Sequence, residues 1–272
     1  FLLPSLLGTG IFVVIPFADV VRRSFTEAFS GKFVGIRNYQ GVFGNEAFHL
    51  AMGNTLRFLI ICIPLLILFS LLLALAIEQM NRHKRIFQAS FLIPMAVPVA
   101  SVVLFWKLTF DRNGYMNGIV GKLGIASVDW MNQGTAFGVL VFSYLWKNMG
   151  YFIVLWLAGL GSIPKAYYEA ARVDGANGRK CFFYITLPQL IPTFFMVVIL
   201  AFVNSFKVFR EAYLIAGDYP HKSIYLLQHL FNNWFVSLDI QKMSTAAVIL
   251  AIGISLFIGG LLLLEKKIGS EE

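Results

Sequence analysis

Charged side chains are scarce in this sequence. Asp, Glu, Lys and Arg make up 13% of its 272 residues, about half of their share in an ordinary soluble domain. Apolar residues make up 58%, which leaves too little polar surface to cover a soluble globule. Disordered and collagen-like chains are also excluded, because aromatic residues reach 15% and glycine and proline follow no period. The composition therefore predicts a polytopic membrane protein.

Other absences exclude further classes. With only two cysteines, Cys62 in an apolar run and Cys181 in a charged loop, a secreted disulfide framework is excluded. The four histidines are scattered and predict no metal site. No Gly-x-x-x-x-Gly-Lys-Ser/Thr phosphate loop occurs, so we predict no ATPase site in this chain. His-Glu-x-x-His and Gly-x-Ser-x-Gly are absent as well, which predicts no catalytic residue and makes a membrane-bound enzyme a weak alternative.

Six apolar stretches are long enough to cross the hydrocarbon core as helices, which takes about 20 residues. Prolines inside several of them kink a membrane helix and need neighbouring helices to satisfy the freed carbonyls. We therefore predict an all-α membrane protein, a six-transmembrane-helix bundle forming one domain over residues 1–272. Because the first stretch begins at an apolar residue, we expect a cytoplasmic leader before it. The predicted spans are Phe1–Ala18, Phe58–Ile77, Ile86–Trp106, Thr135–Leu160, Ile185–Phe206 and Met243–Leu264.

The placement of basic residues predicts the orientation. The loops after the even spans, together with the C-terminus, carry 9 Lys and Arg over 44 residues, whereas the loops after the odd spans carry 10 over 95. The densest group covers 82–85. By the positive-inside rule we place the even loops and both termini in the cytoplasm. The same rule explains the net charge of +8, so no nucleic-acid partner is predicted.

One cytoplasmic loop, 161–187, has a pattern of its own. Ser162 is positioned to cap a helix that runs to about Val173, where Gly175 supplies a left-handed C-cap. A second short helix is expected to begin at Asn177 and lead into the fifth span near Pro188. Two helices this small have too little core to stand alone. The loop is therefore either a docking surface for another protein or an ordinary amphipathic loop.

A spaced set of residues in this loop carries a family resemblance. The set resembles the EAA signature of inner-membrane permease subunits of binding-protein-dependent ABC importers. The neighbouring Leu157–Leu160 and Asp174–Ala176 are similar to the carbohydrate-uptake, maltose-permease-like branch, and the resemblance covers essentially the whole chain. The residues that carry it are Glu169, Ala170, Ala171, Gly175, Ile185, Leu187 and Pro188.

The resemblance implies a mechanism and a set of partners. The chain would have the type I importer permease fold, and its loop would sit in a cleft of a cytoplasmic ATP-binding subunit. ATP and Mg would be bound by a dimer of those subunits, and this chain would hold no cofactor. The other implied partners are a second homologous permease, an extracytoplasmic solute-binding protein and the lipid bilayer of a bacterial or archaeal cytoplasmic membrane. The implied coupling residues are Glu169, Ala170, Ala171, Asp174 and Gly175.

Polar residues at membrane depth indicate a substrate pathway, because they are expensive there. The fourth span carries three on one helix face, and the fifth span ends in others. The resemblance places substrate contacts at these positions and implies that the chain forms half of a translocation pathway for a sugar or oligosaccharide, working by alternating access. The predicted pathway residues are Lys147, Asn148, Tyr151, Asn204, Ser205 and Val208.

Three alternatives stay open at this point. Lys147, Lys207, Arg210 and Glu211 can instead lie at the outer headgroup level, snorkelling or pairing with one another. The basic residues near the site also admit an anionic solute such as a uronide or glycerol phosphate. A secondary transporter is a weaker alternative, because no matching pair of Gly/Pro-interrupted helices occurs in the two halves.

Overall fold

The computed structural model describes residues 2–80 and 84–269, so Arg82 and His83 of the basic loop lie outside the described residues. The described part is helical, with one isolated β-bridge between Thr26 and Phe33. It has five helices long and apolar enough to cross a membrane, or six if the bent pair α5 and α6–α7 counts as one span. The prediction of an all-α protein with several spans is confirmed.

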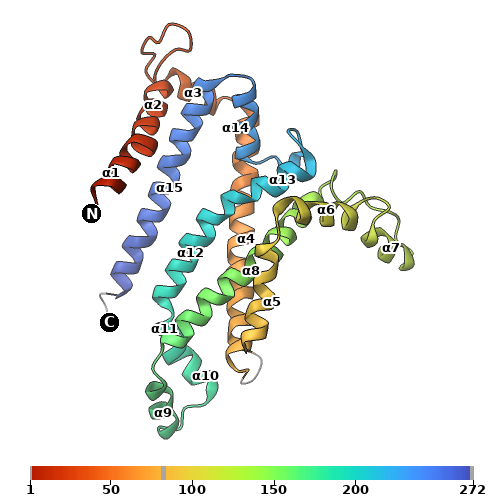
Figure 1. Cartoon of the computed structure of the whole chain (residues 1–272), viewed down its shortest axis with the longest axis vertical. Coiled ribbons are helices and arrows are strands. Elements are labelled where there is room, and N and C mark those ends of the chain that lie inside the picture. Colours follow the sequence, from red (N-terminus) through yellow and green to blue (C-terminus); the bar gives the residue numbers. More distant parts are fainter. Residues whose placement is uncertain (1, 81–83, 270–272) are drawn as a thin grey trace. The chain divides into compact units, whose positions relative to one another are not determined.

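The helices alternate between long spans and short connecting elements (Figure 1). Their bounds are α1 Leu3–Thr9, η1 Gly10–Val14, α2 Ile15–Ser24, α3 Arg37–Phe43, α4 Glu46–Glu78, α5 Lys84–Ala96, α6 Val99–Phe110, α7 Tyr115–Lys122, α8 Ala136–Ser162, α9 Lys165–Val173, α10 Gly178–Cys181, η2 Phe182–Thr186, α11 Leu187–Gln189, α12 Ile191–Ser205, η3 Phe206–Val208, α13 Phe209–Ala216, η4 Lys222–Ile224, α14 Leu227–Val236 and α15 Ile240–Gly269.

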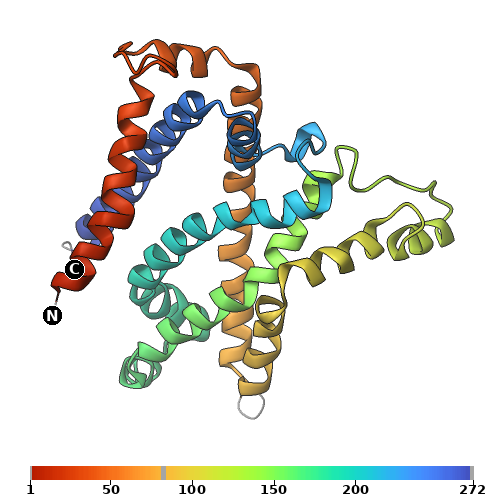
Figure 2. The same ribbon diagram turned by 45° about the horizontal axis from the view of Figure 1, so that its top comes forward.

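Prolines explain the irregular turns. A proline donates no N–H, and its ring clashes with the carbonyl four residues earlier, so a wider π turn relieves both problems. Such turns, η1 and η2, end two residues before Pro16 and Pro188. Pro98 acts more strongly, because it begins α6 with an extended backbone and bends α5 from α6–α7 by 91°. The expected span Ile86–Trp106 is therefore broken, and Figure 2 shows α6 turning away from α5.

The chain divides into two compact units, so the single domain over 1–272 stays a prediction. The first unit contains the residues up to Thr55 and Tyr225–Gly260. Two bonds tie its distant segments together: Asn54 donates to the Tyr225 carbonyl, and the Thr55 hydroxyl accepts from the Leu227 N–H, each at 3.0 Å. The second bond satisfies one of the free N–H groups at the start of α14. The core of this unit contains Val42, Phe48, Ala51, Tyr225, Leu227, Leu230, Trp234 and Ala246.

The second unit, which contains Leu56–Ile224, is built around α8. The helix α5 approaches α8 so closely that a β-carbon on Gly150 would lie 1.8 Å from the Phe91 carbonyl oxygen. On another side, the fully buried Trp156 donates from its indole nitrogen to the Ser70 hydroxyl of α4 at 3.0 Å. The helix α12 also packs on α8. The middle of α8 is therefore fixed by several neighbours, and it is this helix that carries the predicted pathway residues.

Candidate functional site

The loop between α8 and α12 starts differently from the prediction. The Ser162 hydroxyl donates back to the Gly159 carbonyl at 2.7 Å, so Ser162 completes α8. The N-cap of α9 is Pro164, in an extended conformation. The prediction that Ser162 caps the loop helix is wrong, because its hydroxyl bonds to the last turn of the preceding helix instead.

The two later signals in the loop are confirmed. Gly175 has a φ of +78°, in the left-handed region that favours glycine, and the Ala176 N–H closes the end of α9 by donating to the Ala171 carbonyl at 2.8 Å. Asn177 caps α10 by accepting from the Lys180 N–H at 3.0 Å. Local hydrogen bonds therefore fix the path of the chain at both ends of the turn between α9 and α10.

The residues of the EAA pattern lie on the outside of this loop. The helix α9 has no buried residue, and Glu169, Ala170, Asp174 and Gly175 are exposed while Ala171 is half-buried. Within the described residues Glu169 forms no ion pair. Figure 1 shows α9 and α10 at one end of the second unit, beyond the ends of α8 and α11. The loop thus presents an unpaired carboxylate beside small side chains, a surface that another protein can approach closely.

One contact fastens the loop to the spans. The Tyr168 hydroxyl lies 2.9 Å from the hydroxyl of Thr186, a buried residue of η2 just before α11 and α12. At its other end, α9 is joined to α8 by only Ile163 and Pro164. The helix α9 is therefore connected to α8 directly and to α12 through η2 and α11.

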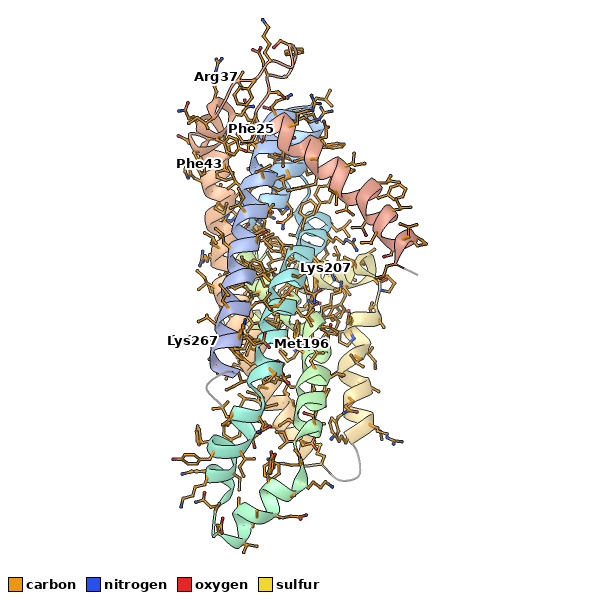
Figure 3. The ribbon with its side chains drawn as sticks, turned by 90° about the vertical axis from the view of Figure 1, so that its left-hand side faces the viewer. Phe25, Arg37, Phe43, Met196, Lys207 and Lys267 are labelled. Atoms are coloured by element: carbon orange, nitrogen blue, oxygen red, sulfur yellow. The ribbon has the colours of Figure 1, made fainter. Side chains whose placement is uncertain are left out.

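A polar pocket of about 340 Å³ lies among α5, α8, α12, η3 and α13. Figure 3 marks Lys207, which lines it, just past the end of α12 farther from the α9–α10 loop, with Met196 closer to that loop. Ser205 does not line the pocket, because it is buried and its hydroxyl donates to the Phe202 carbonyl at 2.5 Å. The predicted pathway residues that the pocket brings together are Lys147, Asn148, Tyr151, Asn204 and Val208.

A buried ion pair forms one wall of the pocket. Lys147 Nζ lies 2.5 Å from Glu211 Oε1, and the two side chains are only 12% and 8% exposed. Lys147 lies 11 residues after the start of α8 and 15 before its end, about 16 and 22 Å along the helix axis. Pairing is therefore confirmed for these two residues, while their depth in the membrane stays a prediction. Lys207 and Arg210 are exposed, and Lys207 donates to Asn204 Oδ1 at 2.6 Å.

Two interruptions of regular helix meet at this pocket. One is the break at Val97 and Pro98 between α5 and α6, and the other is the 3₁₀ turn η3 between α12 and α13. Irregular backbone at membrane depth is tolerated where it is buried or lines a cavity. Sequence reasoning missed the lining residues Met95–Val99 and Tyr144, although the paired prolines at 94 and 98 were a signal of a break there.

Comparison with known proteins assigns the chain to a family. The pattern of the family "Binding-protein-dependent transport system inner membrane component" matches residues 55–269. The arabinooligosaccharides transport system permease protein AraP of Bacillus subtilis is 33% identical over 79% of this chain and 70% of that protein. The sn-glycerol-3-phosphate transport system permease protein UgpA of Yersinia pestis is 30% identical over 91% and 86%.

A solved structure shares the fold. A chain of a bacterial ABC transporter involved in the import of the acidic polysaccharide alginate matches with a TM-score of 0.84 and 21% identity, over 98% of this chain and 93% of that chain. The fold is therefore that of an ABC importer permease, as the resemblance in the loop implied. With the family pattern over 55–269 and relatives of 30% identity or more along most of their length, the chain belongs to the inner membrane components of binding-protein-dependent transport systems.

Proposed function

We propose that this chain is the permease subunit of an ATP-driven importer and forms half of the translocation pathway for a sugar or oligosaccharide. The observation that carries the proposal is the position of α9. It presents an exposed carboxylate and small side chains, and it is connected at its two ends to α8 and, through η2 and α11, to α12. Those two spans carry the polar pocket residues Lys147, Asn148, Tyr151 and Asn204.

Other subunits supply ATP binding, the second half of the pathway and delivery of the solute. A dimer of cytoplasmic ATP-binding subunits holds ATP and Mg and receives the loop residues Glu169, Ala170, Ala171, Asp174 and Gly175. A second homologous permease completes the pathway, and an extracytoplasmic solute-binding protein delivers the solute. The termini and the α9 loop lie in the cytoplasm. Closure of the ATPase dimer moves α9, and α8 and α12 then alternate between inward and outward access.

The pocket supports a saccharide as the solute. It combines the amides of Asn148 and Asn204, the ring of Tyr151 and an ion pair, which are groups that bind hydroxyl-rich ligands. The relative named for arabinooligosaccharides supports the same class. An anionic solute is the second candidate, because Lys207 and Arg210 also line the pocket and one relative is named for sn-glycerol-3-phosphate.

The docking role of α9 is tested by reversing its charge. In the full complex, Glu169→Lys is expected to abolish the co-purification of the ATPase subunit or to uncouple its ATP hydrolysis from uptake. Lys122→Glu, a charge reversal at an exposed position of α7 outside this loop, serves as the matched control. Normal ATP-driven uptake by Glu169→Lys would contradict the assignment, as would uptake driven by a proton gradient in this chain alone.

A further inference from the structure

One atom in the wall of the pocket lacks a hydrogen-bond partner. Glu211 Oε1 accepts from Lys147, but Glu211 Oε2 is buried and has no partner within the described residues. The carboxylate as a whole is 8% exposed and lines the pocket. A buried ionised oxygen is costly unless it receives hydrogen bonds, so an unmet acceptor in a cavity wall needs an explanation.

The neighbouring donors point elsewhere. Lys207 donates to Asn204 Oδ1 at 2.6 Å, and the Asn148 amide donates to the Tyr144 carbonyl at 2.9 Å. The Tyr144 hydroxyl donates to the carbonyl of Ala201 at 3.4 Å. These three donors are therefore engaged by other acceptors, and none of them bonds Oε2 of Glu211. A ligand in the pocket is the natural source of a donor for Oε2.

We propose that Glu211 is a specificity-determining residue that accepts a hydrogen bond through Oε2 from a hydroxyl group of a neutral saccharide. The proposal rests on the proposed function and names the chemical class of the solute. Lys147 orients the carboxylate by binding Oε1. A hydroxyl that donates to a carboxylate forms a short, strong hydrogen bond.

The same geometry disfavours an acidic group at this position. Lys147 and Glu211 neutralise each other, so the deep wall of the pocket offers no net positive charge. A ligand carboxylate or phosphate placed against Oε2 has no proton to donate and is repelled. Lys207 and Arg210 are exposed, so solvent and salt screen their attraction for an anion. The deep wall of the pocket therefore selects an alcohol.

The proposal is tested by direct binding to the complete transporter in nanodiscs. The probes are the neutral trisaccharides maltotriose, cellotriose and arabinotriose and the acidic trimer of galacturonate, measured by titration calorimetry. Wild type is expected to bind at least one neutral probe and to bind it more tightly than the acidic trimer. Glu211→Gln is expected to weaken that binding by about 10-fold or more, since bonds to a charged acceptor are the stronger ones.

Two further variants separate recognition from folding. Lys147→Gln combined with Glu211→Gln removes both buried charges, so it avoids leaving one ion unpaired. If the pair were only structural, this double variant would restore both thermal stability and sugar binding. We expect stability to recover and binding to stay weak. Ser143→Ala is the matched control: the Ser143 hydroxyl is also buried without a partner within the described residues, but it lies outside the pocket, and binding is expected to be unchanged.

The outcomes distinguish a failure of the proposed role of Glu211 from a failure of the proposed importer function. Binding of a neutral probe with equal affinity by wild type and Glu211→Gln would overturn the role of Glu211 while leaving the importer proposal intact. Preference of wild type for the galacturonate trimer would also overturn it and would favour the anionic candidate. Binding of no sugar at all would overturn the substrate class itself, and the role of Glu211 with it.

Discussion

The contact between α5 and α8 gives the sharpest stability prediction. An alanine at position 150 would place its β-carbon 1.8 Å from the Phe91 carbonyl oxygen, 2.4 Å from the Phe91 carbonyl carbon and 3.0 Å from the Leu92 nitrogen. All three are backbone atoms of α5, so no side chain can rotate away. To bring the shortest distance to at least 3.0 Å the two backbones must separate by about 1.2 Å. Gly150→Ala is therefore expected to force α5 off α8.

The expected loss of stability in Gly150→Ala follows from the kind of clash. Overpacking a core costs about 1–3 kcal/mol, and a backbone clash belongs at the upper end of that range. Alanine also favours a helix over glycine by up to about 1 kcal/mol, which offsets part of the loss. A net loss of about 2–3 kcal/mol corresponds to a fall in Tm of about 4–12 °C. The separation also moves Met95 relative to Lys147, which lie on facing helices in the same pocket, so solute binding should weaken as well.

The assay is thermal unfolding of the purified complex, with Gly138→Ala as the matched control. Gly138 is on the same helix, and a β-carbon there would meet nothing within 4 Å. Gly159→Ala adds a contrast, because the three atoms nearest to its β-carbon would all belong to the Thr193 side chain, with Oγ1 at 2.4 Å. Thr193→Ala should relieve that clash, whereas Gly150→Ala has no such remedy. Equal Tm values for Gly150→Ala and Gly138→Ala would refute the reasoning.

Two further predictions concern the connecting segments. Asn117 accepts from the Val128 N–H at 2.9 Å and from the Trp130 indole at 3.2 Å, and it donates to the Val128 carbonyl at 2.8 Å. Asn117→Ala should therefore speed amide hydrogen exchange in residues 111–130, and unchanged protection there would contradict this role. Gly175→Ala places a β-carbon at a φ of +78°, at a cost of about 1 kcal/mol, so the variant should co-purify less ATPase subunit than wild type. Co-purification equal to wild type would contradict this prediction and show that the turn tolerates the change.

Much of the fold could be predicted from hydropathy, because a span needs only length and apolar composition. The break at Pro98 could not, since Val97 and Val99 are as apolar as their neighbours and hydropathy does not register a bend. The turn of the α9 loop was predictable because Gly175 and Asn177 act through bonds to nearby residues. Ser162 was misassigned because two adjacent helices compete for one hydroxyl.

The pocket could be predicted only in part. Lys147, Asn148 and Tyr151 share a face of one helix, so their proximity follows from spacing alone. The bond from Lys147 to Glu211 joins residues 64 apart and depends on how α8 packs near α13, which no local pattern specifies. The structure brings these two residues, for which a position at the headgroup level was an alternative, together in the wall of the pocket.

The bonds that join the start of α4 to the start of α14 constrain the order of events during synthesis. Asn54 and Thr55 emerge from the ribosome 171 and 172 residues before their partners Tyr225 and Leu227. At about 5–20 residues per second, that interval lasts about 10–30 s. During it, the two bonds to Tyr225 and Leu227 cannot form. The first unit can therefore close only after the intervening spans have been delivered to the membrane, which makes its assembly a late step of biogenesis.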